Sequence, residues 1–431
     1  MSAVEQEGKV LRPANVFWFY LPLAVMWLTM GLENPIITAF IARLPEVREN
    51  LAAFGVAFSL ALVVASPIIM LITAATALAY NRANYNRLLS FTNLLSLMLT
   101  LLHLLIGVTP LYRIIVDTII GVPEVIIEPS RRAFLVMIPW AAALAYRRLF
   151  EGVLIRFKKT GLLPITTLSR LVTVIVVLAV GFSKKMAGAS LGAGALSCGV
   201  VVSAVISFAF CQRVVRAMPE AEKGECISWR QLIHFYAPLA LTSFLTLSSM
   251  PLLSIGLARA PEPLSSLAVW PVITGVMLII RSLAMAAQEV VVALIAEQRS
   301  FTVLQRFTRV LSLVLVGILA IFAFSPLSGL WFSKVAGLSG ALTDFARVPM
   351  MILFLIPGLE TMLSWNRGLL VHEKRTRVIS QAVMLNLVVL VTVMFIGAAI
   401  LPIKGAVTAA IALTSALGLE SFYLWWRHSG K

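Results

Sequence analysis

Charged residues are scarce in this sequence. Asp, Glu, Lys and Arg make up 13% of the 431 residues, whereas 60% of the residues are hydrophobic. A soluble domain is nearer to a quarter charged, so one water-soluble core cannot cover this much apolar surface. The composition excludes an ordinary soluble domain and predicts a chain whose solvent is the lipid bilayer.

Cysteines and catalytic motifs are scarce as well. Cys198, Cys211 and Cys226 form no CxxC or Cys/His spacing, which disfavours a disulfide framework and a structural zinc. No Walker A or HExxH pattern is present, and the four histidines are scattered. We therefore expect no enzyme, no metal and no cofactor, and ATP-driven transport by this chain alone is disfavoured.

The net charge is +16, which on a soluble protein would point to nucleic acid. In a membrane protein the same cations are typical of cytoplasmic loops, which collect Lys and Arg. About 19 cations fall in one set of alternate loops and about 10 in the other. We expect the richer side, with both termini, to face the cytoplasm across the plasma (inner) membrane, and we expect no nucleic-acid partner.

Long apolar runs fill most of the chain. Each is long enough to cross a hydrocarbon core of about 30 Å, which needs about 20 helical residues. The runs are 16–40, 51–80, 87–110, 133–155, 162–182, 188–212, 232–258, 264–296, 310–332, 343–370, 378–402 and 405–427. They predict an all-α polytopic membrane protein of about twelve spanning helices. The longest polar segments between them are 111–132 and 213–231.

An internal repeat divides the chain. The residues Phe19–Ala24, FYLPLA, return as Phe235–Ala240, FYAPLA, at a shift of 216 residues. The same shift relates prolines, glycines and loop cations: Pro35 to Pro251, Arg43 to Arg259, Pro45-Glu46 to Pro261-Glu262, and Gly152 to Gly368. Matched turn residues and charges at one constant shift indicate a duplication.

The repeat predicts two lobes of six helices, at residues 1–215 and 232–431, joined by a cytoplasmic linker at 216–231. Six helices separate the copies, so both copies have the same orientation, with a pseudo-two-fold axis along the membrane normal. Such halves form the framework of an alternating-access transporter. A membrane enzyme or a scramblase with the same duplicated fold is the alternative.

Prolines fall at equivalent places in the first and seventh helices. Pro35 and Pro251 each remove a backbone hydrogen bond and favour a kink. Both residues are gating candidates, since the bend can serve as a hinge; a bend that only serves packing is the other interpretation.

Ionisable side chains within the apolar runs mark the interior or the transport pathway, because insertion at membrane depth costs about 2.5–3.5 kcal/mol each. The candidates for lining a substrate cavity are Glu33, Asn34, Arg147, Arg148, Glu151, Arg170, Arg281 and Arg367. The coupling or gating candidates are Glu33, Glu289 and Glu360, with the two prolines.

Two interpretations of these charges stay open. In the functional one, arginines of both halves converge on a cavity and bind an anion, which suits the planar fork of guanidinium. In the structural one, Arg147 pairs with Glu151 four residues later and similar pairs neutralise each other, while Arg367 and Glu289 reach toward an interface.

Four stretches resemble the progressive ankylosis protein family, a branch of the multidrug/oligosaccharidyl-lipid/polysaccharide (MOP) exporter superfamily. They are Glu33 with the run Leu51–Leu60, Arg131-Arg132-Ala133-Phe134-Leu135 with Gly152, Tyr236–Leu241, and Lys404–Thr408 with Leu417–Ser421. The positions matched to the family are Glu33, Arg131, Arg132, Gly152 and Glu420. The resemblance implies a fold like that of the MATE transporters and a rocker-switch exporter of anions such as citrate, ATP or pyrophosphate.

The sequence departs from animal members of that family in two respects. Helix four carries Arg147, Arg148 and Glu151 where animal members are largely uncharged, and the long acidic tail is absent, since the sequence stops at Lys431. Together with the short loops, these two differences indicate a prokaryotic homologue that transports a substrate of its own.

The sequence therefore predicts a secondary-active exporter of a small anionic metabolite, monomeric in the lipid bilayer, with a proton or sodium ion as the coupling ion. The alternatives are a cation-coupled multidrug exporter and a flippase for a lipid-linked sugar or phospholipid.

Overall fold

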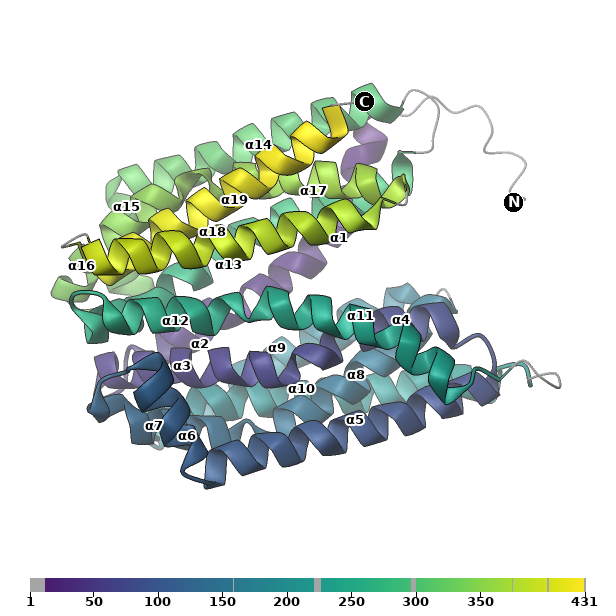
Figure 1. The fold of residues 1–431 in the computed structure, drawn as a ribbon, viewed down its shortest axis with the longest axis horizontal. Helices are drawn as coiled ribbons and strands as arrows, with labels where there is room; N and C mark the ends of the chain where they lie inside the picture. Colours follow the sequence, from purple (N-terminus) through teal and green to yellow (C-terminus); the bar gives the residue numbers. More distant parts are fainter. Residues whose placement is uncertain are drawn as a thin grey trace. The chain divides into compact units, whose positions relative to one another are not determined.

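The computed structural model describes residues 12–157, 159–220, 226–295, 300–373, 375–400 and 403–429. Within these ranges the regular structure is helical throughout, and the ranges hold no strand (Figure 1). The helices of the first half are α1 (Pro13–Gly31), α2 (Glu33–Ile41), α3 (Val47–Ala65), η2 (Ser66–Met70), α4 (Leu71–Leu78), α5 (Arg82–Val108), α6 (Leu111–Arg113), η3 (Ile114–Ile120), α7 (Glu124–Val136), α8 (Ile138–Arg156), η4 (Thr160–Leu162), α9 (Leu163–Ser183) and α10 (Gly188–Arg216).

The second half follows the same plan. Its helices are α11 (Trp229–Leu247), α12 (Ser249–Arg259), α13 (Pro263–Leu294), α14 (Ser300–Phe324), α15 (Pro326–Leu330), η5 (Trp331–Val335), α16 (Gly340–Ile352), η6 (Leu353–Leu355), α17 (Ile356–His372), α18 (Thr376–Ile400) and α19 (Gly405–Ser429). In the described part of the chain, twelve helical segments are long and apolar enough to cross a membrane, as the sequence predicts.

The backbone repeats at the shift found in the sequence. Two non-glycine residues with left-handed backbone, Glu46 and Glu262, both have φ of 53° and lie 216 residues apart. Gly121 and Gly337, at the same spacing, have φ of 80° and 76°, which glycine adopts without a Cβ penalty. Each of these glycines ends a loop that contains a π-helix, η3 or η5. The duplication therefore extends to loop geometry that apolar patterning does not specify.

The proline kinks are present at both predicted places. The first spanning segment breaks between α1, which ends at Gly31, and α2; the seventh breaks between α11, which ends at Leu247, and α12. Each break lies four residues before Pro35 or Pro251, where the proline ring would clash with the backbone carbonyl of a continuous helix. Whether these kinks act in gating stays a prediction.

The segment 111–132 is not the polar connection that the sequence indicates. It contains α6, the π-helix η3 and most of α7, which begins at Glu124 and leads almost directly into α8. An acidic residue in the first turn suits a helix N-terminus, and Pro123 precedes it. The expectation of a polar connection was wrong because α7 begins before the apolar run, and the first residues of this helix are not apolar enough to be recognised in the sequence.

Packing groups the described residues into two compact units, one of residues 1–35 and 272–431 and the other of residues 36–271. In the first unit, Val16, Tyr20 and Ala24 of α1 share a buried cluster with residues of α13 and α14. In the second unit, α8 and α10 pack closely together, and α11 packs against η2. The lobes of residues 1–215 and 232–431 follow the repeat and stay a prediction; part of their linker, 221–225, lies outside the described residues.

Candidate functional site

The first group of charges at membrane depth lies on α8 and is called here the α8 cluster: Arg147, Arg148 and Glu151. Arg147 Nε lies 2.8 Å from Glu151 Oε1, and Arg148 Nη1 lies 3.4 Å from Oε2 of the same carboxylate. The pair of Arg147 and Glu151 predicted from their spacing is therefore confirmed. One carboxylate faces two guanidinium groups, and Arg148 makes the longer of the two contacts with it.

The two arginines differ in accessibility. The side chain of Arg147 is 2% exposed, whereas that of Arg148 is 19% exposed. The buried Nε of Arg148 has no hydrogen-bond partner among the described residues. A buried donor without a partner is costly, so Arg148 is held less completely by the protein than a fully bonded guanidinium would be.

Arg170 and Gly152 lie in the same unit as the α8 cluster. The stem of Arg170, on α9, lies beside α10, because a Cβ at Gly199 would be 3.3 Å from its Cγ. Gly152 lets α8 approach α4, since a Cβ there would be 2.5 Å from the carbonyl oxygen of Ile72. Gly152, a family-matched position, is therefore needed for packing.

A second group of charges, called here the α17 group, lies in the other unit and consists of Arg281, Glu360, Arg367, Asn386 and Glu420. Arg281 of α13 donates through Nη2 and Nε to Glu360 Oε2 of α17, at 2.8 and 3.2 Å. Arg367 of α17 donates to Glu420 of α19, whose second oxygen accepts from Asn386 Nδ2 of α18 at 2.9 Å. Each arginine here has its own carboxylate, so the four charges of these two pairs cancel.

Arg281 and Arg367 are each 25% exposed, while Glu360 and Glu420 are buried. The expectation that Arg367 reaches toward an interface was wrong, because a buried carboxylate two helices away holds it. Sequence reasoning missed Asn386, although it lies 216 residues after Arg170 in an otherwise apolar helix. It also missed Arg347 of α16, whose buried Nε has no partner among the described residues.

Glu33 begins α2 and is buried, as expected of a residue at membrane depth. Its neighbours pack on α13: a Cβ at Gly31 would be 2.9 Å from the Leu278 carbonyl oxygen, and a Cβ at Gly275 would be 3.3 Å from Pro35 N. Asn34 is partly buried at the same bend. Glu289 lies on α13, but its side chain lies outside the described part of the chain.

The family-matched Arg131 and Arg132 lie at the end of α7 next to α5. Arg131 donates to the carbonyl oxygens of Gly107 and Val108 at 2.7 and 3.0 Å, which caps the C-terminus of α5. Arg132 pairs with Glu128 at 3.1 Å and is largely exposed. Nearby Tyr112 is fully buried, and burial raises its pKa because the phenolate is disfavoured there. Arg131 therefore ties α7 to the end of α5, and Arg132 forms an exposed pair within α7.

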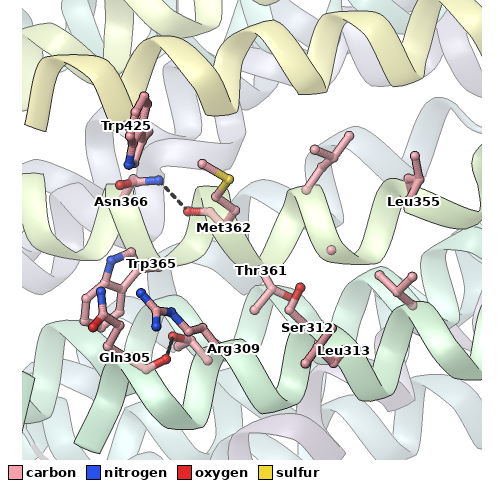
Figure 2. Close-up of a pocket in the computed structure, with 14 residues that line it drawn as sticks. Gln305, Arg309, Ser312, Leu313, Leu355, Thr361, Met362, Trp365, Asn366 and Trp425 are labelled. Atoms are coloured by element: carbon pink, nitrogen blue, oxygen red, sulfur yellow. Dashed lines mark hydrogen bonds between the residues drawn. The ribbon is translucent and has the colours of Figure 1, made fainter. Parts of the chain in front are cut away.

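A groove of about 730 Å³ opens between α14 and α17 in the unit of residues 1–35 and 272–431 (Figure 2). Gln305, Arg309, Trp365 and Trp425 lie toward one end, and Leu355 toward the other. The sequence did not indicate it, because its walls come from three helices. Among the described residues, no three His, Cys, Asp or Glu side chains are placed to hold a metal ion.

The fold is that of solved transporters of the MOP superfamily. A multidrug resistance MATE family transporter in an inward-facing conformation has a TM-score of 0.73 at 14% identity, covering 95% of this chain and 98% of that chain. The lipid II flippase MurJ, in an inward closed conformation, has a TM-score of 0.74 at 13% identity, covering 96% and 87%. A MOP superfamily transporter from Pyrococcus furiosus has a TM-score of 0.66 at 16% identity, covering 97% and 96%.

No curated protein matches the sequence significantly. The family described as "Progressive ankylosis protein (ANKH)" matches residues 11–266, which is more than half of the sequence. The twelve apolar helices make the chain an integral, multi-pass membrane protein. Its fold is shared with solved membrane transporters. The chain belongs to the progressive ankylosis protein family.

Proposed function

We propose that the protein is a secondary-active exporter of a small organic or phosphate-containing anion, of the class of citrate, ATP or pyrophosphate. The observation that carries the proposal is the α8 cluster, in which Arg147 and Arg148 share the single carboxylate of Glu151. A surplus guanidinium at membrane depth is costly unless an anion compensates it. A carboxylate or phosphate group of the substrate supplies that compensation in bidentate form.

We assign different roles to the two arginines. Arg147 is buried and held by Glu151 at 2.8 Å, so it positions the carboxylate. Arg148 contacts the same carboxylate at 3.4 Å, is partly accessible and has an unpartnered Nε. A substrate anion therefore competes with Glu151 for Arg148, and the protein releases it when Glu151 takes the arginine back.

The transport cycle follows from the duplicated fold. Two halves of one orientation alternate access by rocking about the site, with kinks at Pro35 and Pro251 as hinges. Glu33, buried at the first kink, is the coupling candidate for a proton or sodium ion. The arrangement we propose is a monomer in the plasma membrane with both termini in the cytoplasm.

A transporter of the same fold supports a positively charged site in this protein. The Pyrococcus furiosus transporter is described as having a binding pocket of reverse polarity that suggests a different function. The fold is therefore compatible with pockets of more than one polarity, and an arginine-rich site need not bind cationic drugs.

Flipping of a lipid-linked phosphate compound is the second candidate. MurJ, a lipid II flippase, is as similar in fold as the MATE transporter, and an arginine surplus also suits a diphosphate. This candidate differs from the first in its substrate, which carries an acyl or prenyl chain.

Uptake into proteoliposomes under an imposed proton or sodium gradient tests the proposal. Labelled citrate, ATP and pyrophosphate are compared with a cationic dye and with a fluorescent phospholipid. We expect saturable uptake of at least one anion, weakened about tenfold or more in Arg148→Gln, because a hydrogen bond to a charged group contributes about 1.5–3 kcal/mol.

The matched control is Arg132→Gln, which removes an exposed arginine paired outside the α8 cluster and should leave uptake unchanged. Unaltered anion uptake by folded Arg148→Gln would refute the role of the cluster. Dye uptake without anion uptake would assign the protein to the multidrug exporters, and lipid transfer alone would assign it to the flippases.

A further inference from the structure

The groove between α14 and α17 belongs to the unit of residues 1–35 and 272–431, and its lining includes no residue of the α8 cluster or of the α17 group. Its volume is about 730 Å³, and α14, α17 and Trp425 of α19 supply its walls (Figure 2). We propose that this groove binds one acyl chain of an anionic phospholipid, with the lipid phosphate held against Arg309. The inference does not depend on the transported substrate.

The walls of the groove are apolar although several lining residues are polar. Thr308 donates its hydroxyl to the Leu304 carbonyl at 3.0 Å, and Thr361 donates to the Pro357 carbonyl at 2.7 Å. Asn366 Nδ2 donates to the Met362 carbonyl at 2.9 Å, as the dashed line in Figure 2 shows. Because these donors are bonded within their own helices, the groove is left with methyl and methylene surface, which suits a hydrocarbon chain.

The length of the groove matches the thickness of one leaflet of the bilayer. From Gln305 to Val316 the lining of α14 spans eleven residue steps, which at 1.5 Å per residue is about 16 Å. One leaflet contributes about half of the hydrocarbon core of about 30 Å. Leu313, on the rim, is 74% exposed, and Leu355 at the far end is also exposed. The groove is therefore open along a side that carries apolar residues, so a chain can enter from the bilayer.

The polar end of the groove complements a phosphate. Arg309 is exposed, and no acidic side chain of the described residues forms an ion pair with it. Trp365 and Trp425 lie at the same end, where indole rings typically anchor a protein at the membrane interface (Figure 2). Basic residues at a membrane surface attract anionic lipid head groups.

Lipid binding by the purified full-length protein tests the proposal. The probes are phosphatidylglycerol and phosphatidylcholine with identical acyl chains, and the readouts are the thermal unfolding midpoint in detergent and the lipid retained in native mass spectrometry. We expect phosphatidylglycerol to raise the midpoint and to be retained at one site. Arg309→Gln should weaken this retention about fivefold.

Arg306→Gln is the matched control, because Arg306 is exposed on the same helix one turn earlier and does not line the groove. It should behave as the wild type. Equal responses to the two lipids, or equal losses in the two arginine variants, would refute a phosphate site at Arg309.

A second variant and a second probe test the apolar part. Ser312→Leu adds volume inside the groove and should reduce retention of phosphatidylglycerol while Arg309 is unchanged. Glycerol 3-phosphate, which has the head-group charge without acyl chains, should not raise the unfolding midpoint. Stabilisation by this probe equal to that by the lipid, or full retention in Ser312→Leu, would refute acyl-chain binding.

Discussion

The α8 cluster and the α17 group occupy related places in the two halves but differ in charge balance. Glu151 and Arg367 lie 216 residues apart, each directly before a glycine at which its helix packs closely, and Arg170 and Asn386 have the same spacing. The α8 cluster has two arginines for one carboxylate, whereas the α17 group has a carboxylate for each arginine. The duplication has preserved the close glycine contact, while the residue before the glycine is acidic in one half and basic in the other.

The comparison of the two groups distinguishes charged residues that serve the structure from charged residues that can bind a substrate. Closed pairs of buried charges serve mainly to satisfy each other, and their net contribution to stability is small. Arg148, which makes the longer contact with a shared carboxylate, is the arginine of the two groups best able to exchange its partner for an anion. This contrast is the reason that we propose the anion site at the α8 cluster and a positioning role for the α17 group.

The largest effect is expected from Glu151→Gln, which removes the carboxylate that pairs with the buried Arg147 at 2.8 Å. We expect this variant to lose about 3–5 kcal/mol of unfolding free energy, measured by chemical unfolding in one detergent. Glu360→Gln is the comparison in the α17 group; since Arg281 is partly exposed, its loss should be about 1–3 kcal/mol.

Adding Arg147→Met to Glu151→Gln should recover part of the lost stability, because the most deeply buried guanidinium is then gone and the remaining Arg148 is 19% exposed. Equal losses for Glu151→Gln and Glu360→Gln, without recovery in the double variant, would contradict the contrast between the two groups.

An intermediate effect is expected at the repeated close contacts of glycine. In Gly152→Ala the new Cβ would meet a backbone oxygen at 2.5 Å, whereas in Gly368→Ala it would meet the Val291 side chain at 2.7 Å. Because a backbone carbonyl yields less than a side chain, we expect a loss of about 1–3 kcal/mol for Gly152→Ala and a smaller one for Gly368→Ala. Thermal unfolding of the two proteins side by side measures the difference, and the reverse order would be inconsistent with this packing.

The smallest effect is expected at an ion pair outside the spanning helices. Arg113 and Glu124 lie 2.7 Å apart, but their side chains are 62% and 71% exposed. Arg113→Gln should change the free energy of unfolding by less than about 1 kcal/mol, and added salt should reduce the difference further. A loss as large as that of Glu151→Gln would mean that burial is not what distinguishes the α8 cluster.

The fold was largely predictable from sequence because its signals are strong. Apolar runs of membrane length give the spans, and the constant shift of prolines and loop cations gives the duplication. The kinks at Pro35 and Pro251 follow from proline chemistry alone. The amphipathic start of α7 could not be found in this way, because it lies outside an apolar run.

The candidate site was predictable only where its partners are close in sequence. The pairing of Arg147 with Glu151 follows from helical spacing. The partners of Arg281 and Arg367 lie 79 and 53 residues away, so they depend on which faces of α13, α17 and α19 meet. Sequence alone also does not show that Arg148 keeps an unpartnered Nε, because its pairing depends on the packing around α8.

The position of α1 has a consequence for biosynthesis. Tyr20 of α1 donates to the Leu283 carbonyl 263 residues later, and the cluster around Tyr20 is closed by α13 and α14. At translation rates of about 5–20 residues per second, the first helix to enter the membrane waits on the order of tens of seconds for its partners. During that interval its polar bend at Glu33 is without them, so a chaperone or the insertion machinery itself has a window in which to act on the nascent protein.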